Sequence, residues 1–552
     1  MVWLGPEEEF SDSAMRLIRI LAASWRVDEG EGLAKLMAED SQSWYTKIGC
    51  EEGSLQNCWE GMRSLMLTNY WKRVWIVQEL AMGGRESPLL YGDACVSFGE
   101  VCDATAQWMT RHGRVASLPM LSDRLASRAQ RLRNVQNFQI TSETSPEELF
   151  GTLAVLSRAL SDIASIGGIL ETQNTDQWII DHDRITFVES VANRLKGASV
   201  MHSPPANLVA LGRTSEASQP QDKIYGFLSL MDPEFSSQFE VDYNQNATEV
   251  YTSFSVNWTK YSKKLDLFTH CFLEHNHTPS WVPDWNFNDA DSLPAYYIGE
   301  EDDRYLAGGL KTIVDVEFSP DLKRMKTVGM LVDQIDGLTT ADDEGPDSIR
   351  QSSATVKGTF DEVRKALWQT FVANRDHFDG EPTPTPILPD ENAESLLDVP
   401  LPKEPGSGLP EPYQRGLYKF IEANQTFLIN GLRLDQYFVN NGQRIEVAST
   451  AQETLPECSK RFDLRRQIFT ASLLLKRRRL ATTLNGRLAL VPRATNPGDI
   501  VAILVGCGQA VILRSVDDSF KVVGTAYVHG IMEGELLTKE IFLENASEVW
   551  LS

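Results

Sequence analysis

A tryptophan-rich segment from Tyr70 to Glu79 is the first place where the side chains of this sequence could do chemistry. It reads YWKRVWIVQE, and in a helix Lys72, Trp75 and Glu79 share one face because they lie three and four residues apart. A carboxylate held beside tryptophans in an apolar pocket would have a raised pKa, which suits a general acid or base. The interpretation we favour is a buried polar network, with Gln78 and Glu79 hydrogen bonded so that they fix the helix to its neighbours.

Two further clusters have the residue types of cofactor sites but not their spacing. His270, Cys271, His275 and His277 fit no common zinc pattern, so we expect a polar loop and no metal site. The run Gly506–Gly508 lacks the third glycine of a dinucleotide fingerprint, and a strand-like segment follows it. We therefore expect a turn there and no nucleotide site.

Charged runs give two more candidates. Asp181-His182-Asp183 could be a base with its orienting carboxylate, but neighbouring residues rarely face each other, so we favour a solvated turn. The basic run at 476–479 could be an import signal or an anion-binding patch. We favour an exposed helix face at the end of a basic helix near 460–478.

Composition excludes several classes of protein. The 552 residues include 52 Lys and Arg against 77 Asp and Glu, a net charge of −25, which disfavours binding to nucleic acid. No apolar run approaches the ~18 residues of a membrane-spanning helix. The start of the sequence lacks the pattern of a signal peptide, and the cysteine count of 7 is odd. We expect a cytoplasmic protein with reduced thiols.

The elements that must position these segments indicate an α+β (mixed) fold. Helical periodicity dominates the N-terminal half, and short alternating segments with turn residues dominate the C-terminal part. Local signals include a capping box at Ser97 and Glu100, and turns at Asn485-Gly486 and Asp517-Asp518. We predict these regions: a first region at 1–100, a helical region at 101–262, a mixed α/β region at 263–378, a Pro-rich acidic linker or loop at 379–412, and a β-rich unit with a basic helix at 413–552.

Three local expectations can be checked directly. A continuous helix is expected from about residue 55 to 81, ended by Gly83-Gly84, and another over 222–231. The opening Val2–Gly5 segment is typical of a buried strand, either at the edge of a sheet or in a sequence that begins in the middle of a fold; we favour the second.

Several segments together resemble the fungal heterokaryon-incompatibility (HET) domain family. YWKRVWIVQEL resembles the third block of that domain, QDKIYGFL at 221–228 and SWVPDW at 280–285 are similar to downstream elements, and 497–535 is similar to the C-terminal block. The opening VWLG is similar to the strand that ends the second block. The positions that carry the resemblance are Trp71, Arg73, Trp75, Gln78, Glu79, Asp222, Lys223, Trp281, Pro283, Asp284, Trp285, His529, Gly530 and Gly534.

The first block of the family and most of the second have no counterpart before Val2. The resemblance therefore implies that residues 1–100 are the C-terminal part of a HET-like domain, which is a truncated domain. It implies a helix-rich N-terminal region with a partial α/β HET lobe, followed by a β-rich C-terminal unit. Within that frame we expect the Trp281–Trp285 element to be structural, with Asp284 capping a turn at a domain seam. We expect His529 and Gly530 to form the closing turn of the last hairpin, with proton transfer by His529 a lesser alternative.

The resemblance implies non-self recognition and programmed cell death in fungi, acting mainly through protein–protein contacts. The alternatives are a TIR-like NAD hydrolase and a degenerate or truncated member without activity, so whether the chain is an enzyme stays open. No cofactor is implied, and NAD enters only as a substrate. Glu79 is the one weak catalytic candidate. Protein partners are expected, self-association is an open alternative, and neither nucleic acid nor a membrane span is expected.

Overall fold

The computed structural model divides into two compact units, each described here by itself. The first comprises residues 1–202 with 408–410, and the second comprises 203–407 with 411–552. Helices and strands are both present, which confirms a mixed α+β fold. The linker at 379–412 and the Asp181–Asp183 segment lie outside the described residues. Those described are 2–5, 10–28, 58, 61, 64, 65, 68, 70, 73–108, 205, 208, 212, 213, 215–273, 279–286, 305–309, 315–341, 344–374, 414–438, 471, 472, 474, 475, 478–538 and 544–552.

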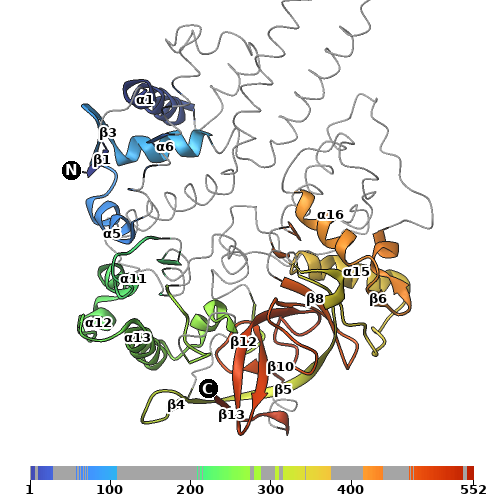
Figure 1. Ribbon diagram of the computed structural model, residues 1–552. Helices are drawn as coiled ribbons and strands as arrows, with labels where there is room; N and C mark the ends of the chain where they lie inside the picture. Colours follow the sequence, from blue (N-terminus) through green and yellow to red (C-terminus); the bar gives the residue numbers. More distant parts are fainter. Residues whose placement is uncertain are drawn as a thin grey trace, which may run out of the picture. The chain divides into compact units, whose positions relative to one another are not determined.

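The described part of the first unit is a small sheet with helices (Figure 1). Strands β1 (Val2–Gly5), β2 (Pro88–Tyr91) and β3 (Ala94–Ser97) form a sheet in which β1 is parallel and β3 antiparallel to β2. Helix α1 (Ser11–Asp28) packs against α6 (Phe98–Trp108). The predicted capping box begins α6, because the Ser97 amide donates to Glu100 Oε2 (2.8 Å) and the Glu100 amide donates to Ser97 Oγ (3.1 Å).

One expectation for the first unit stays open and another is wrong. β1 lies at an edge of the described sheet, in agreement with the edge-strand alternative, with Leu4 buried and Trp3 63% exposed; that the sequence begins in the middle of a fold stays a prediction. The continuous helix over 55–81 is broken at Arg73, whose backbone is extended (φ −76°, ψ 137°). Helix α5 begins only at the next residue and spans Val74–Gly83. It ends at Gly83-Gly84 as predicted, with Gly84 at φ +68°.

Helices and 3-10 turns occupy the described start of the second unit. α11 (Asp222–Tyr225) is followed by the 3-10 turn η4 (Leu228–Leu230), so the predicted single helix over 222–231 is wrong. The chain then turns at Asp232, whose side chain caps α12 (Pro233–Ser236) with proline at its first position. α13 (Ala247–Ser262) and the 3-10 turn η5 (Asp266–His270) complete the set.

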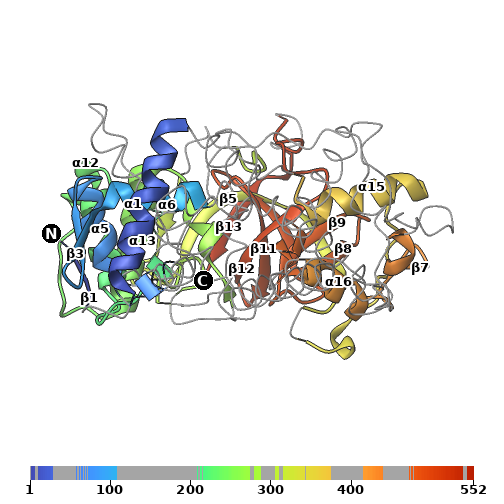
Figure 2. The ribbon, with the colours of Figure 1, turned by 90° about the horizontal axis from the view of Figure 1, so that it is seen from above.

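Six strands of the second unit close into an antiparallel barrel (Figures 1 and 2). They are β5 (Met325–Leu338), β8 (Arg478–Thr483), β9 (Leu488–Pro492), β10 (Ile500–Leu504), β11 (Ala510–Val516) and β12 (Ser519–Val528). Pairing runs from β5 to β10, β11, β12, β9, β8 and back to β5. β4 (Glu317–Phe318) and β13 (Ser547–Leu551) add to the first half of β5. Closure leaves these strands with no long free edge.

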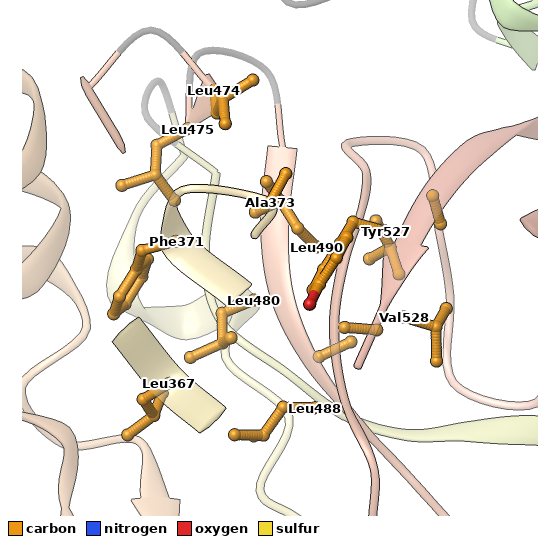
Figure 3. Packing of buried hydrophobic residues seen from close by; sticks show 14 of the residues in the cluster. Leu367, Phe371, Ala373, Leu474, Leu475, Leu480, Leu488, Leu490, Tyr527 and Val528 are labelled. Carbon is orange, nitrogen blue, oxygen red and sulfur yellow. The ribbon is translucent and has the colours of Figure 1, made fainter. Parts of the chain in front are cut away.

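The chain between β5 and β8 covers the outside of the barrel. It includes α15 (Phe360–Phe371), α16 (Gln414–Ala423), the hairpin of β6 (Leu428–Ile429) and β7 (Leu432–Arg433), and the turn η9 (Leu434–Phe438). Figure 3 shows Leu367 and Phe371 of α15 beside Leu480, Leu488 and Leu490. All residues of β8 and β9 are buried, because the barrel interior covers one face and this layer the other.

The predicted turns are confirmed, but two neighbouring expectations are not. Gly486 joins β8 to β9 at φ +76°, and Asp517 joins β11 to β12. Arg478 and Arg479 are buried in β8, so the predicted exposed face of a basic helix is wrong at these two residues. His529-Gly530 is a turn but closes no hairpin, because the next strand, β13, runs parallel to β12 and antiparallel to β5.

A carboxylate on β5 fastens the covering layer to the barrel. Asp336 accepts hydrogen bonds from the Ser352 hydroxyl (2.8 Å), from the Ser353 amide (2.6 Å) and hydroxyl (2.7 Å), and from the Ala354 amide (2.9 Å). Partial burial would raise the pKa of Asp336, but these hydrogen bonds outweigh it and hold the pKa below 3.8. The segment 352–354 is therefore held by an ionised group.

We expect Asp336→Asn to lower the free energy of unfolding by about 1 kcal/mol at pH 7, because the amide cannot accept all of these hydrogen bonds. The difference from wild type should be complete above the unfolded pKa near 3.8 and should vanish as the pH falls through the lower folded pKa. Urea unfolding at several pH values measures it. Asp518→Asn, at a carboxylate that is 78% exposed, is the control, and an equal loss in the control would contradict the assignment.

Candidate functional site

The segments at 221–228 and 280–285, far apart in sequence, meet around Gly212. A Cβ atom added to Gly212 would lie 3.1 Å from Phe227 and 3.4 Å from Trp285, so glycine allows the two segments to approach. We call this contact the motif junction and define it as Arg213, Asp222, Lys223, His270 and residues 280–285.

The two tryptophans of the junction face different elements. Trp285 is fully buried and packs edge-on against Phe254 of α13, with ring centroids 5.3 Å apart. Trp281 packs against Phe318 of β4 at 5.5 Å, and its indole N–H donates to the Lys323 carbonyl (3.3 Å). Pro283 between them is also buried. The 280–285 segment therefore joins the helical layer to the β4–β5 hairpin.

Asp284 and Ser280 fix the two ends of that segment. The Asp284 carboxylate accepts from the Asn286 amide (2.9 Å), so it caps a turn as expected from the sequence. The Ser280 hydroxyl donates to the Ser552 carbonyl and accepts from the Val522 amide (2.9 Å). The junction is thereby tied to β12 and to the segment that ends β13.

Two buried cations of the junction donate to backbone carbonyls. Lys223 Nζ donates to the Gly212 carbonyl (2.8 Å) and to that of Ser215. Arg213 Nε donates to the Asp284 carbonyl (3.1 Å), and its Nη2 donates to the His270 carbonyl. Charge-assisted bonds of this kind are stronger than neutral ones, so the cations hold loop carbonyls that would otherwise be desolvated.

The acidic partner of this region is Asp222. Its carboxylate accepts from the Tyr243 hydroxyl (2.7 Å), and this hydrogen bond together with partial burial raises the pKa of Tyr243 to about 12. The tyrosine thus stays protonated and donates throughout the physiological range. Asp222 and Lys223, adjacent in sequence, bind different loops, so the motif residues serve to position backbone.

The described part of the chain contains no recognisable metal site. The described residues contain no group of three or more His, Cys, Asp or Glu placed to hold a metal ion. His275 and His277 lie outside them, so only His270 and Cys271 of the four-residue cluster noted in the sequence are described. Cys271 is fully buried, and burial raises the pKa of its thiol, which keeps it unreactive.

In the first unit, the structure does not place Glu79 in an apolar pocket. Glu79 is exposed and accepts a hydrogen bond from the Tyr70 hydroxyl (3.3 Å), while Gln78 and Trp75 are half-buried. Because α5 starts at Val74, its buried face is filled by Val74, Ile76, Val77, Leu80 and Ala81, and Glu79 lies on the other face. The expected buried Gln-Glu pair is therefore wrong. Arg73 is exposed, Trp71 lies outside the described residues, and a catalytic role for Glu79 stays a prediction.

His529, Gly530 and Gly534 follow β12. His529 is half-buried, and its Nδ1 lies 3.4 Å from the Tyr527 hydroxyl oxygen. Burial lowers the pKa of His529, against an opposing effect of Glu535, so the ring is neutral at pH 7. Gly530 and Gly534 have φ of +82° and +84° and serve as turn residues. The pair Tyr527–His529 could pass a proton, but it lies outside the motif junction as defined.

Sequence reasoning missed the arginines that line the barrel wall. Arg514 forms a bidentate pair with the buried Asp499 (2.9 and 2.8 Å), and Arg479 pairs with Glu344. Arg478 is different: its Nη1 donates to the Thr525 carbonyl (2.9 Å), and its Nη2 has no hydrogen-bond partner among the described residues. Burial lowers the pKa of Arg478 to about 10. The signals in the sequence were the basic run at 476–479 and, for Asp499 and Arg514, their place in the segment 497–535 that resembles the C-terminal block.

We expect Lys223→Met to lower the free energy of unfolding by about 2 kcal/mol, because it leaves buried carbonyls without a donor. Urea unfolding followed by tryptophan fluorescence measures the change, since Trp285 lies in the same junction. Lys263→Met, at an exposed lysine that follows α13, is the matched control and should change stability by less than about 0.5 kcal/mol.

We expect substitution by methionine to change the free energy of unfolding differently at Arg514 and at Arg478. Arg514→Met leaves the Asp499 carboxylate buried without its partner, so we expect a loss of about 3 kcal/mol. Arg478→Met removes a buried charge for which the described residues provide no salt bridge, so stability should stay within about 1 kcal/mol of wild type or rise. Thermal unfolding of both variants tests the pair. Equal losses would show that Arg478 is also ion-paired.

Comparison with known proteins gives one match. Residues 463–543 match the family model described as the Het-6 beta-barrel domain. This range contains β8 to β12, five of the six strands that close the barrel. No curated protein matches the chain, and no solved structure matches it. Over this range the chain is thus similar to a barrel domain of a family related to heterokaryon incompatibility, and the matched range does not include the segments at 70–79, 221–228 and 280–285.

Proposed function

We propose that this chain is a HET-type protein that acts in fungal non-self recognition and regulated cell death, mainly through protein–protein contacts in the cytoplasm. The observation that carries the proposal is the match of residues 463–543 to the Het-6 beta-barrel domain. The resemblance of YWKRVWIVQEL, QDKIYGFL and SWVPDW to elements of the HET domain family supports it, because these segments precede the barrel strands in the expected order.

The geometry of the motif residues supports contacts rather than catalysis. The buried cations Arg213 and Lys223 donate to backbone carbonyls, and both tryptophans of the 280–285 segment are packed inside. Such groups rigidify a scaffold, and a rigid scaffold presents a fixed surface to a partner. Among the described residues, no helix is both long and apolar enough to span a membrane.

The test is expression of the full chain in a filamentous fungus, followed by fusion with a panel of incompatible and compatible strains. We expect death of fused cells, scored by a vital dye, only with particular partner strains. Arg514→Met, which disrupts the barrel, should abolish the response, whereas Asp518→Ala at an exposed barrel turn should preserve it. Death with every strain, or equal death with Arg514→Met, would contradict recognition through the barrel.

The same cells distinguish the two alternatives. A TIR-like NAD hydrolase would lower cellular NAD before death, and Glu79→Gln would prevent this loss. A degenerate or truncated member would cause neither death nor NAD loss with any strain. We expect cellular NAD to stay unchanged until membranes fail, because Glu79 is exposed and its described contact is a tyrosine hydroxyl.

A further inference from the structure

A groove between α12 and α13 combines aromatic rings with polar side chains. It encloses about 350 Å³ and is lined by Phe235, Gln238, Phe239, Asn257, Lys260 and Tyr261. This volume lies in the range of small-molecule and side-chain sites. The groove is separate from the motif junction residues and from the barrel strands as defined above, so nothing in the proposed function uses it.

The walls of the groove are rigid. Phe235 is buried and contacts Trp258 edge-on at 5.2 Å and Tyr261 at 5.4 Å. Phe239 packs edge-on against Phe254 at 5.6 Å. Because each ring is braced by another aromatic side chain, the groove keeps its shape without a ligand, which reduces the entropic cost of binding.

The polar side chains give the groove its selectivity. Asn257 and Gln238 are exposed amides, and of the described residues that line the groove Lys260 alone is charged. Lys260 also lies over the Phe318 ring, with its Nζ 5.4 Å from the ring centroid, which fixes the cation at one end. Amide side chains suit a ligand with free carbonyl groups, and the lysine suits one with negative charge.

A polyproline II segment with acidic flanks meets all three requirements. Its proline rings pack on aromatic side chains, and its backbone carbonyls are free of internal hydrogen bonds. The sequence contains a segment of matching composition: residues 380–391 read GEPTPTPILPDE, with four prolines and three acidic residues. Its negative charge is complementary to Lys260.

We propose that the groove formed by Phe235, Phe239, Asn257, Lys260 and Tyr261 binds the proline-rich acidic segment 380–391 of a second copy of this chain. Every copy carries both the groove and the segment, so the contact is heterologous and links copies head to tail. The partner is therefore identified by its chemistry, as an extended proline-rich strand with carboxylates at its ends.

The first experiment measures binding of a fluorescent peptide with the sequence of residues 380–391. The receptor is the full chain with Pro382, Pro384, Pro386 and Pro389 replaced by alanine, which removes competition from its own segment. We expect saturable binding by fluorescence anisotropy. Phe239→Ala and Tyr261→Ala in this receptor should each weaken binding roughly tenfold, and Lys260→Glu should weaken it more at low salt than at high salt.

Two controls separate this effect from misfolding. A peptide with the same charges but alanine in place of the four prolines leaves the receptor untouched and should not bind. Phe360→Ala removes an exposed aromatic residue of α15, 41% exposed, and should bind the proline peptide as the parent receptor does. Binding of the alanine peptide with equal affinity would overturn the proposal, and so would unchanged binding by Phe239→Ala and Tyr261→Ala.

The second experiment tests the source of the segment. Light scattering of the wild-type full chain should show a mass that rises with concentration, whereas the four-proline variant and Tyr261→Ala should stay monomeric at the same concentrations. A wild-type chain that is monomeric at all concentrations would overturn binding to a second copy. Neither experiment uses cell death as a readout, so failure here and failure of the proposed function are distinguishable.

Discussion

The second unit depends on β5, because the backbone of this one strand forms hydrogen bonds with two different barrel strands, β10 and β8. Its middle pairs with β10, from Gly329 opposite Leu504 to Gln334 opposite Ile500, and its end pairs with β8. Register shifts between Val501 and Ala502, and between Ile335 and Gly337, bend the ladder where it changes partner. Without β5, both β8 and β10 would present open edges, which invite pairing with other chains.

Closure of the barrel also means that charged residues on its buried strands need a hydrogen-bond or ion-pair partner. β8 and β9 are buried along their whole length, so a charge on them is desolvated whichever way it points. The buried carboxylates of Asp333 and Asp499 each have an arginine partner: Arg487 binds Asp333 (3.1 Å), and Arg514 binds Asp499. Arg478 relies on a carbonyl instead. These residues explain why a chain with so many carboxylates keeps arginines in its barrel wall.

Hydrogen bonds and a ring contact connect the helical layer to the barrel. Ser280 binds both Ser552 and Val522, Leu265 binds the carbonyl of Gly506 in the β10–β11 turn, and Trp281 lies on β4. The 280–285 segment, which resembles the HET family and lies outside the matched range, thus contacts β12 inside that range. These hydrogen bonds fix the position of the motif junction relative to the barrel.

Local features could be predicted from the sequence because they depend on a few neighbouring residues. The capping box at Ser97, the end of α5 at Gly83-Gly84 and the turns at Gly486 and Asp517 follow from backbone preferences that act within four residues. The mixed α+β class follows from periodicity, which is also local. The family-like segments at 221–228 and 280–285 were visible as sequence, although their contact around Gly212 was not.

Only the tertiary structure decided which strands pair and which faces are buried. Ile500 lies opposite Gln334 across more than 160 residues, and no local pattern encodes such a partner. Strands covered on both faces lose the alternation that marks them, which is why Arg478 and Arg479 had the pattern of an exposed helix although they lie in buried β8. Glu79 was misplaced for a related reason: its helical face depends on where α5 begins, and the extended backbone of Arg73 sets that start. The caps and turns named above came from sequence, whereas burial, charge environment and the type of the 478–479 segment came from contacts between residues far apart in the chain.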